Sequence, residues 1–324
     1  MGRDPAGAVA VVGSLAMDFT AFAGRFPRVG ETLVGDAFTM VPGGKGGNQA
    51  IAAARQGART SMIGCVGRDL LGDQVLDTLR ADQVDTGHIL RSEQTQTGVA
   101  HIVVDGAGDN AIIAVPLANT ELTPAHIDAC ADVIAAADVL LVQLEIPIES
   151  VAHALRIATS AGTMTILNPA PARQLSDELL LDVDVVMPNE TEAEILTSTS
   201  VREVADAEEA ALALARRGIG EVVITLGDRG AIYHVGGRSE LVRPYDVDAV
   251  DATAAGDAFC GAFAAGIARG DTRRAALEYA AAAGALAVTV EGASSSLPTL
   301  EDVERLHRSA GETTRAGRHT DRGG

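Results

Sequence analysis

The strongest chemical signal in the sequence is a carboxylate that follows a run of small residues. Asp257 stands in the first turn of a predicted helix, Gly256–Arg269, directly after Ala254, Ala255 and Gly256. Small residues leave successive backbone N–H groups free to point at an anion, and the helix dipole adds partial positive charge at the same end. An Asp at this position most often only pairs with the dipole. Beside such N–H groups it is also suited to take the proton of a hydroxyl during an in-line phosphoryl transfer.

A second motif, PGGKGGNQ at 42–49, places four glycines around Lys45 in front of another predicted helix. Glycines let the backbone approach a ligand closely, and the helix start offers unpaired N–H groups. The spacing is not that of a Walker A loop, in which the Lys follows the last Gly and precedes Ser or Thr. A flexible turn explains the glycines equally well. Lys45 and Asn48 favour a binding site, because a turn needs neither.

Two further motifs follow predicted strands. PNETE at 188–192 comes after strand Val185–Met187, and TLGDRG at 225–230 ends strand Val222–Leu226. The acids at 190 and 192 would ordinarily serve as helix caps, and the glycine turn is equally compatible with a hairpin into 231–235. Ligands in open α/β sheets bind at the carboxyl ends of strands, and all four motifs fall at such ends.

The elements that must position these motifs alternate between strand and helix. This alternation predicts an α/β fold with a mostly parallel, doubly wound sheet that has helices on both faces. The predicted strands are 9–12, 61–66, 139–143, 165–167, 185–187 and 222–226, and the predicted helices are 48–56, 71–81, 124–136, 148–160 and 205–217.

Two segments interrupt the alternation. Glu31–Met40 and the pair Val99–Asp105 and Asn110–Val115 have the pattern of antiparallel hairpins with no helix between them. We expect them to form a small β-sheet lid, from roughly 15–42 and 95–117, over the carboxyl ends of the core strands. Residues 307–324 are polar and Gly-rich without a period, and are predicted to be a disordered tail.

Composition excludes several classes of function. The chain of 324 residues has 44 Asp and Glu against 25 Lys and Arg, a formal charge of −19, and 3% aromatic residues without Trp. Such a field repels phosphate backbones and anionic lipid, so we expect neither nucleic acid nor membrane as a partner. The first residues are typical of a strand rather than a signal peptide. Because the three cysteines, Cys65, Cys130 and Cys260, form no disulfide pattern, we expect a cytoplasmic protein.

Seven motifs taken together resemble the ribokinase family of carbohydrate kinases, and the resemblance runs from about Val9 to Leu306. It implies a ribokinase-like fold and one kinase domain over 1–306. The motifs are GSLAMD at 13–18, GGKGGNQA at 43–50, QLEIP at 143–147, LNPAPAR at 167–173, PNETEAE at 188–194, TLGDRG at 225–230 and DATAAGDAF at 251–259.

The resemblance also implies roles for individual residues. Asp257 matches the family's base, and Ala254, Ala255 and Gly256 match its anion hole. The sugar-binding positions are Ala16, Met17, Asp18, Gly44, Lys45, Gly46, Gly47, Asn48 and Glu145, together with Asp257. The ATP-binding positions are Asn189, Glu190, Thr225, Leu226, Gly227, Asp228, Arg229, Gly230 and Ala281, with Gly256 and Asp257.

Two cations are implied in the same way. Glu190 matches a residue that arranges hydrated Mg²⁺ through water. A monovalent cation, usually K⁺, would be held mostly by backbone carbonyls, and oxygen ligands suit such a hard ion. The matching positions are Asp251, Thr253, Ala287, Val290, Gly292 and Ser296.

The resemblance implies ATP-dependent phosphorylation of D-ribose at O5 and a homodimer that forms through the lid. Some members have Asn at the position of Ala16. A kinase of 2-deoxyribose, another pentose or a nucleoside therefore remains an alternative. A non-catalytic sugar-binding protein is a third hypothesis, although such a protein has no need to keep Asp257 and its neighbours.

Overall fold

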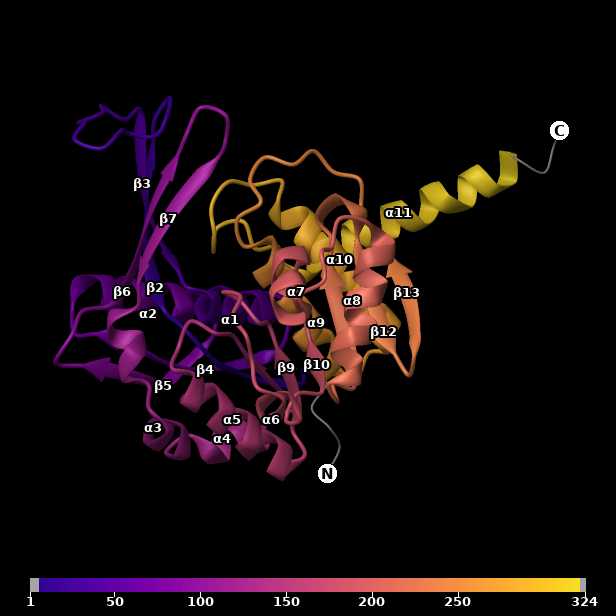
Figure 1. Ribbon diagram of the computed structural model, residues 1–324, viewed down its shortest axis with the longest axis horizontal. Helices are drawn as coiled ribbons and strands as arrows, with labels where there is room; N and C mark the ends of the chain where they lie inside the picture. The colour runs from indigo at the N-terminus through magenta and orange to yellow at the C-terminus, as the bar shows by residue number, and fades with distance from the viewer. Residues whose placement is uncertain (1–5, 321–324) are drawn as a thin grey trace.

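A central sheet of nine strands organises the chain in this computed structural model, which describes residues 6–320 (Figure 1). Its strand order is β13-β12-β11-β10-β9-β8-β1-β4-β5. The pairs β11–β12 and β12–β13, at one edge, are antiparallel and the other pairs are parallel, so the prediction of a mostly parallel sheet is confirmed. The strands are β1 Ala8–Val12, β4 Arg59–Gly67, β5 Asp85–Ser92, β8 Val139–Val142, β9 Met164–Leu167, β10 Val185–Val186, β11 Glu221–Thr225, β12 Ala231–Val235 and β13 Arg238–Val242.

Helices cover both faces of this sheet. In β1, Val9 and Val11 belong to one apolar cluster and Ala10 and Val12 to the other, because successive side chains of a strand point to opposite faces. One helical layer contains α1 Lys45–Arg55, α2 Leu70–Ala81, α9 Ala255–Arg269, α10 Arg273–Ala287 and α11 Leu300–Thr320. The other contains α3 Pro124–Asp128, α4 Ala131–Ala136, α5 Ile148–Ala161, α6 Asp177–Leu180, α7 Glu190–Thr197 and α8 Val204–Arg216.

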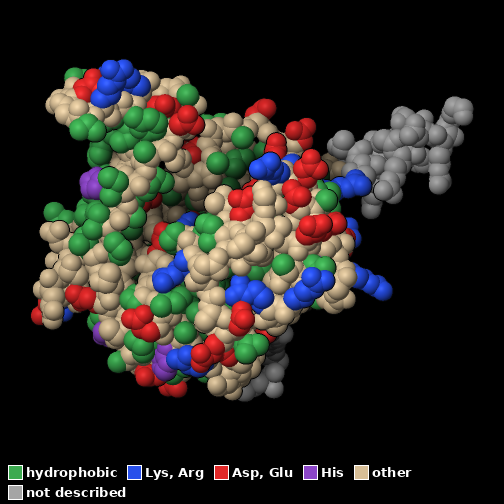
Figure 2. All heavy atoms as spheres, viewed as in Figure 1, with side chains coloured by type: hydrophobic (Ala, Val, Ile, Leu, Met, Phe, Trp, Pro, Cys, Tyr) green, Lys and Arg blue, Asp and Glu red, His purple; other side chains and the backbone are tan. Residues whose placement is uncertain are grey.

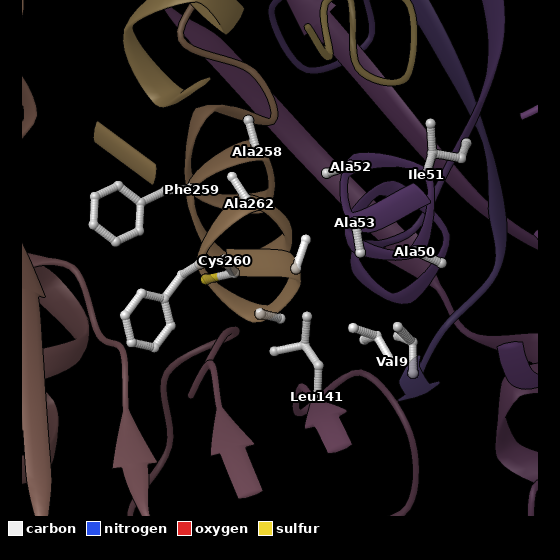
Figure 3. Close-up of a cluster of buried hydrophobic side chains, with 14 of the residues drawn as sticks. Val9, Ala50, Ile51, Ala52, Ala53, Leu141, Ala258, Phe259, Cys260 and Ala262 are labelled. Atoms are coloured by element: carbon white, nitrogen blue, oxygen red, sulfur yellow. The ribbon is translucent and has the colours of Figure 1, made fainter. Parts of the chain in front are cut away.

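Small side chains bring α1 and α9 close together. Ala52 and Ala53 of α1 face Ala258 and Ala262 of α9 above the sheet (Figure 3). At Gly261 the approach is closest, since a Cβ built there would lie 2.5 Å from the Cβ of Ala52. The alanine-rich composition thus places the first turns of these two helices next to each other.

A second sheet of four strands forms the predicted lid, in the order β3-β2-β6-β7. It consists of β2 Ala16–Phe22, β3 Ala37–Gly43, β6 Gly98–Val104 and β7 Asn110–Val115. β2 and β6 pair parallel, and the two outer pairs are antiparallel. The strand expected over 31–40 begins only at Ala37, and β2 supplies the partner that the sequence pattern did not identify.

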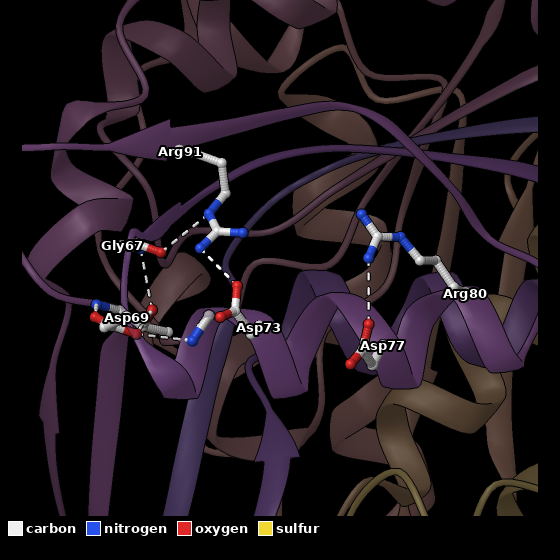
Figure 4. A network of polar contacts seen from close by, with 8 residues as sticks. Gly67, Asp69, Asp73, Asp77, Arg80 and Arg91 are labelled. Carbon is white, nitrogen blue, oxygen red and sulfur yellow. Dashed lines mark hydrogen bonds and ion pairs between the residues drawn. The ribbon is translucent and has the colours of Figure 1, made fainter.

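Polar contacts fix the base of the lid to α2 (Figure 4). Asp69 caps α2 by accepting from Gly72 N at 2.8 Å, and it also accepts from Thr97 N at 2.8 Å beside the start of β6. Arg91 on β5 donates to Gly67 O at 3.2 Å and to Asp73 at 2.8 Å. The half-buried contact between Asp69 and Thr97 therefore anchors the start of β6 to α2, and the exposed pair of Arg91 and Asp73 joins β5 to the same helix.

Two expectations differ from the structure. The single helix predicted over 124–136 is divided, because Cys130 leaves helical geometry (φ −109°, ψ 10°) between α3 and α4. Residues 307–320 are helical as part of α11, where a disordered tail was expected, and 321–324 lie outside the described residues. Val303 is buried and His307 Nδ1 lies 2.7 Å from the hydroxyl of Tyr245, so tertiary contacts hold the first turns of this helix.

Candidate active site

A cavity of about 500 Å³ lies between the lid and the carboxyl ends of the core strands. The inner face of the lid contributes Ala100, Ile102, Ile112 and Ala114, and the core contributes most of the polar groups. The volume is in the range of small-molecule sites. The predicted positions that line it are Ala16, Asp18, Gly44, Lys45, Asn48, Glu145, Thr253, Ala254 and Asp257.

Asp257 lies at the floor of this cavity and is only 6% exposed. Its Oδ2 accepts from Asn48 Nδ2 at 3.0 Å, and its Oδ1 accepts from Gln49 Nε2 at 2.9 Å. Burial raises the pKa of Asp257, while Lys45 and the two amide donors oppose that shift. A buried carboxylate with a raised pKa is a better proton acceptor than a solvated one.

The start of α9 carries the residues for which the resemblance implies an anion hole. Ala254 is the N-cap residue and adopts left-handed geometry (φ 60°, ψ 7°), which is costly for a residue with a Cβ. No side chain caps this helix end. A Cβ at Gly256 would meet nothing within 4 Å, so an anion has room to approach the backbone there. Ala254 lines the cavity, whereas Ala255 and Gly256 are not among its lining residues.

The glycines of the second motif serve the protein's own packing. A Cβ at Gly43 would lie 2.2 Å from Oδ2 of Asp18, and one at Gly46 would lie 2.6 Å from Ser14 N. Gly43 and Gly46 thus make room for Asp18 and Ser14 rather than for a ligand alone. They let α1 begin against the β1–β2 connection, which leaves Lys45 and Asn48 on the cavity side while Gly46 and Gly47 lie behind it.

Glu145 closes the start of α1. Its Oε2 accepts from Lys45 N at 3.0 Å and from the hydroxyl of Ser14. Burial and the nearby carboxylates Glu145 and Asp257 raise the pKa of Asp18 to about 6, and Lys45 opposes this shift. The carboxylates of Asp18, Glu145 and Asp257 thus line the same cavity, where they can accept hydrogen bonds from the hydroxyls of a polyol.

Two buried polar residues of the cavity lining are not among the predicted site residues. Ser14 lies within the GSLAMD motif, and Asn119 belongs to no motif. The side chain of Asn119 accepts from Leu15 N at 2.9 Å and donates to Leu15 O at 2.8 Å, which links the second lid segment to the first. Met17, a predicted sugar-binding position, is instead 1% exposed and packs into the core.

The predicted nucleotide-binding positions at 189–190 and 225–230 lie next to each other at the ends of β10 and β11. Asn189 caps α7 and forms an isolated bridge with Thr225. Arg229 of the 3₁₀ helix Gly227–Arg229 pairs with Glu190 at 2.7 Å. The same segments also have purely structural roles. Asn189 and Glu192 form a capping box, and β11 continues as a hairpin into β12. Ala281 is half-buried on α10, outside the cavity lining.

Glu192 has the helix-cap role that the sequence suggested for it. It is 8% exposed, and its carboxylate accepts from Asn189 N at 2.9 Å and from Asn189 Nδ2 at 3.1 Å. Burial raises its pKa, and the backbone N–H of Asn189 and the charge of Lys45 oppose that shift. Glu192 is not part of the cavity lining, and Glu190 is half-exposed and engaged by Arg229.

The predicted monovalent-cation positions lie on two adjoining loops. Asp251 accepts from Thr253 N at 2.9 Å and from Gly292 N at 2.9 Å, which joins the loop before α9 to the loop after α10. Asp251 N in turn donates to Val288 O at 3.1 Å. Ser296 is turned to its own segment, where its hydroxyl donates to Ala293 O at 2.9 Å.

The sequence profile of the pfkB family of carbohydrate kinases matches residues 7–300. The chain belongs to this family. It is therefore a sugar kinase, and the fold and family predicted from the sequence are confirmed.

Individual relatives agree with this family. A ribokinase of Haemophilus influenzae is 40% identical over 292 residues, which cover 90% of this chain and 95% of that protein. A deoxyribokinase of Salmonella typhi is 35% identical over 294 residues, covering 90% and 96%.

Solved structures have the same fold. Arabidopsis thaliana ribokinase, complexed with ribose and ATP, has a TM-score of 0.87 and 29% identity, covering 93% of this chain and 99% of that one. An Escherichia coli structure in complex with ATP and Mg²⁺ has a TM-score of 0.78 and 25% identity, covering 94% and 99%.

Proposed function

We propose that this sugar kinase transfers the γ-phosphoryl group of ATP to O5 of D-ribose, giving D-ribose 5-phosphate and ADP. The observation that carries this proposal is the position of Asp257, buried between two amide donors on the floor of the cavity, directly after an uncapped helix start. One group takes the proton and the adjoining N–H groups face the moving charge.

In the proposed mechanism, Asp18, Asn48 and Glu145 bind ribose hydroxyls and direct O5 toward Asp257. Asp257 accepts the proton of O5 as that oxygen attacks the γ-phosphorus and ADP leaves in line. The backbone N–H groups of 254–256 stabilise the charge on the transferred group. The lid excludes water, which would otherwise compete with ribose for the phosphoryl group.

The nucleotide would lie along the segments that follow β10 and β11. Asn189 and Glu190 start α7 beside the loop 225–230, and Ala281 on α10 is proposed to lie near the adenine. Gly256 and Asp257 lie at the end of this path, where the γ-phosphate would meet the sugar.

The residues present fit Mg²⁺ bound with the nucleotide. Mg²⁺ prefers one or two carboxylates together with substrate phosphates and water, and the described residues contain no group of three or more acidic, His or Cys side chains that would form a separate cage. Glu192 is buried at the start of α7, where Asn189 holds its carboxylate, and Glu190 would act through water. When bound, the ion neutralises phosphate charge during transfer.

The two loops around Asp251 fit K⁺, since they offer carbonyl and carboxylate oxygens. The proposed carbonyl ligands include those of Ala287 and Val290. Bound there, K⁺ would hold the loop that carries Ala254 and so fix the anion hole before transfer.

We further propose a homodimer formed through the lid and a cytoplasmic location. A row of side chains, Met40, Phe19, His101 and Ile113, crosses the outer face of the lid, and Ile113 is 69% exposed. Figure 2 shows hydrophobic side chains gathered on the lid. Among the described residues no helix has the length and hydrophobicity to cross a bilayer. The three free cysteines are compatible with a reducing compartment.

The Asp257→Asn variant tests the assignment of the base. The amide keeps the shape of the side chain but cannot accept the O5 proton, so kcat is expected to fall about a hundredfold or more, with ribose binding retained. ADP release and ribose titration calorimetry measure the two effects. A variant with a near-normal kcat would refute the assignment.

A kinase of 2-deoxyribose is the second candidate function. Ala16 lines the cavity without a polar atom, so a contact that reads a sugar hydroxyl is lacking at this position. Initial rates with ribose, 2-deoxyribose, adenosine and fructose, each with and without K⁺, separate the candidates. We expect the highest kcat/KM for ribose and a several-fold loss without K⁺. A preference for adenosine would contradict the ribose assignment, and equal rates without K⁺ would contradict the cation site.

A further inference from the structure

Gln49 contacts Asp257 but does not contribute to the cavity. It is fully buried, and its Nε2 donates both to Asp257 Oδ1 at 2.9 Å and to Asn168 Oδ1 at 3.0 Å. Asn48, which holds the other oxygen of Asp257, does line the cavity. Its Oδ1 is buried without a protein partner, so Asn48 is free to turn to a bound hydroxyl. The two oxygens of Asp257 therefore have different environments.

Gln143 fixes the orientation of the Gln49 amide. Gln143 follows β8, is fully buried and donates from Nε2 to Gln49 Oε1 at 2.6 Å. A flipped Gln49 amide would lose this bond and would turn its oxygen toward the carboxylate of Asp257, where two acceptors repel each other. Gly13 makes the arrangement possible, because a Cβ there would lie 2.0 Å from Gln143 Oε1.

We propose that Gln49, oriented by Gln143, is a positioning residue for phosphoryl transfer: it holds Oδ1 of Asp257 so that Oδ2 faces the sugar hydroxyl. This inference rests on the proposed function. During transfer the O5–H bond breaks and its proton goes to Oδ2, O5 forms a bond to the γ-phosphorus, and ADP leaves with the electron pair of the broken P–O bond. Gln49 keeps the carboxylate from rotating when Asn48 turns to the sugar.

Other titratable groups surround Asp257 and are the same in the wild type and in the variants described below. They are Lys45 on α1, Asp18 on β2, Glu145 after β8 and Glu192 on α7, with the thiol of Cys260 on α9 itself. The bond from Gln49 lowers the pKa of Asp257 against the effect of burial. Removing this donor alone should therefore raise the pKa of the base.

The Gln49→Met variant tests the proposal, because Met has a similar length and no donor. We expect kcat to fall about ten- to a hundredfold, with the KM for ribose within about twofold because Gln49 does not touch the cavity. The acid limb of the pH profile of kcat should move up by about one unit. Gln49→Glu, which places a second acid beside Asp257, should move it further. Gln143→Leu should shift it in the same direction by less.

Gln56→Met is the matched control. Gln56 is a second buried Gln, at the C-terminal end of α1, and its Nε2 donates to Pro298 O at 2.9 Å. The residues that contact Asp257 lie at the opposite end of α1. This variant should lose stability in thermal unfolding without a change in the pH profile. If Gln49→Met does not fold, Gln49→Glu, which differs by one atom, carries the test.

The outcomes separate the two proposals. An unchanged kcat and pH profile in Gln49→Met or in a folded Gln49→Glu, or the same profile shift in Gln56→Met, would overturn the role of Gln49. If the role of Gln49 is overturned in this way while Asp257→Asn is inactive in the same assay, Asp257 still stands as the base and the proposed function is unaffected. A near-normal kcat in Asp257→Asn would refute Asp257 as the base, whereas a wild type that forms no ADP from ATP and ribose would refute the proposed function itself.

Discussion

At the scale of residues, the site concentrates negative charge around a single ammonium group. Burial lowers the pKa of Lys45, but Asp257, Glu145 and Glu192 more than offset this and raise it. Lys45 therefore stays charged and partly balances the carboxylates. The remaining excess of negative charge explains why a triphosphate would need cations to enter the same region.

The negative charge of Asp18 should lower the free energy of unfolding, although the same charge favours ribose binding. Its pKa is about 6 in the folded protein against 3.8 ordinarily. A carboxyl whose pKa is raised on folding destabilises the protein once it ionises, so the cost grows as pH rises from about 4 to 6 and is complete above. Asp18→Asn should therefore gain about 1–2 kcal/mol of unfolding free energy near neutral pH and lose ribose affinity.

Denaturant unfolding at neutral and acidic pH measures this prediction. The gain of Asp18→Asn over the wild type should shrink as the pH approaches 4. A gain that is independent of pH would show that the ionisation of Asp18 is not its cause.

At the scale of elements, the site depends on the contact between α1 and α9. These helices carry Asn48 and Asp257, and their close approach rests on small residues such as Gly261 and Ala52 (Figure 3). Protein interiors are close-packed, so a change in this contact is transmitted to the first turns of both helices.

Gly261→Ala should test this coupling. The added Cβ would lie 2.8 Å from Ala53 N and 2.8 Å from Gln49 O, and the helices must separate to accept it. We expect a loss of about 1–3 kcal/mol of unfolding free energy, together with a reduced kcat. Gly24→Ala, with open space around the new Cβ, is the control. Equal stability and kcat in the two variants would contradict the coupling.

At the scale of the whole molecule, both faces of the lid sheet carry apolar side chains, but only the inner face lies over the rest of the protein. Its inner face, with Ile102 and Ile112, lies over the cavity. Its outer face carries Phe38, which is 62% exposed, and Ile113. Exposed apolar patches of this kind mark association surfaces, and the open edges of β3 and β7 add unpaired backbone groups.

Ile113→Lys should prevent association through the lid. A charge on the outer face cannot be buried without a partner, so sedimentation velocity should show a dimer for the wild type and a monomer for the variant. Leu181→Lys, which replaces another exposed side chain (68%) far from the lid, should remain dimeric. A monomeric wild type, or an Ile113→Lys dimer, would contradict the proposed dimer.

The sequence by itself determined the alternation of strands and helices, the lid segments and the motifs at the strand ends, because these depend on local patterns. Asp257 and Ala254–Gly256 could be found in this way. Only the tertiary structure decided which groups meet: Gln49 and Gln143 behind Asp257, Asn119 under the lid, and Arg229 with Glu190. It also decided that Gly43 and Gly46 accommodate Asp18 and Ser14, and that contacts such as Tyr245 with His307 order the start of the last helix. The reason is physical: each of these roles is set by burial and by a partner distant in the chain, and neither is encoded in the local spacing of residues.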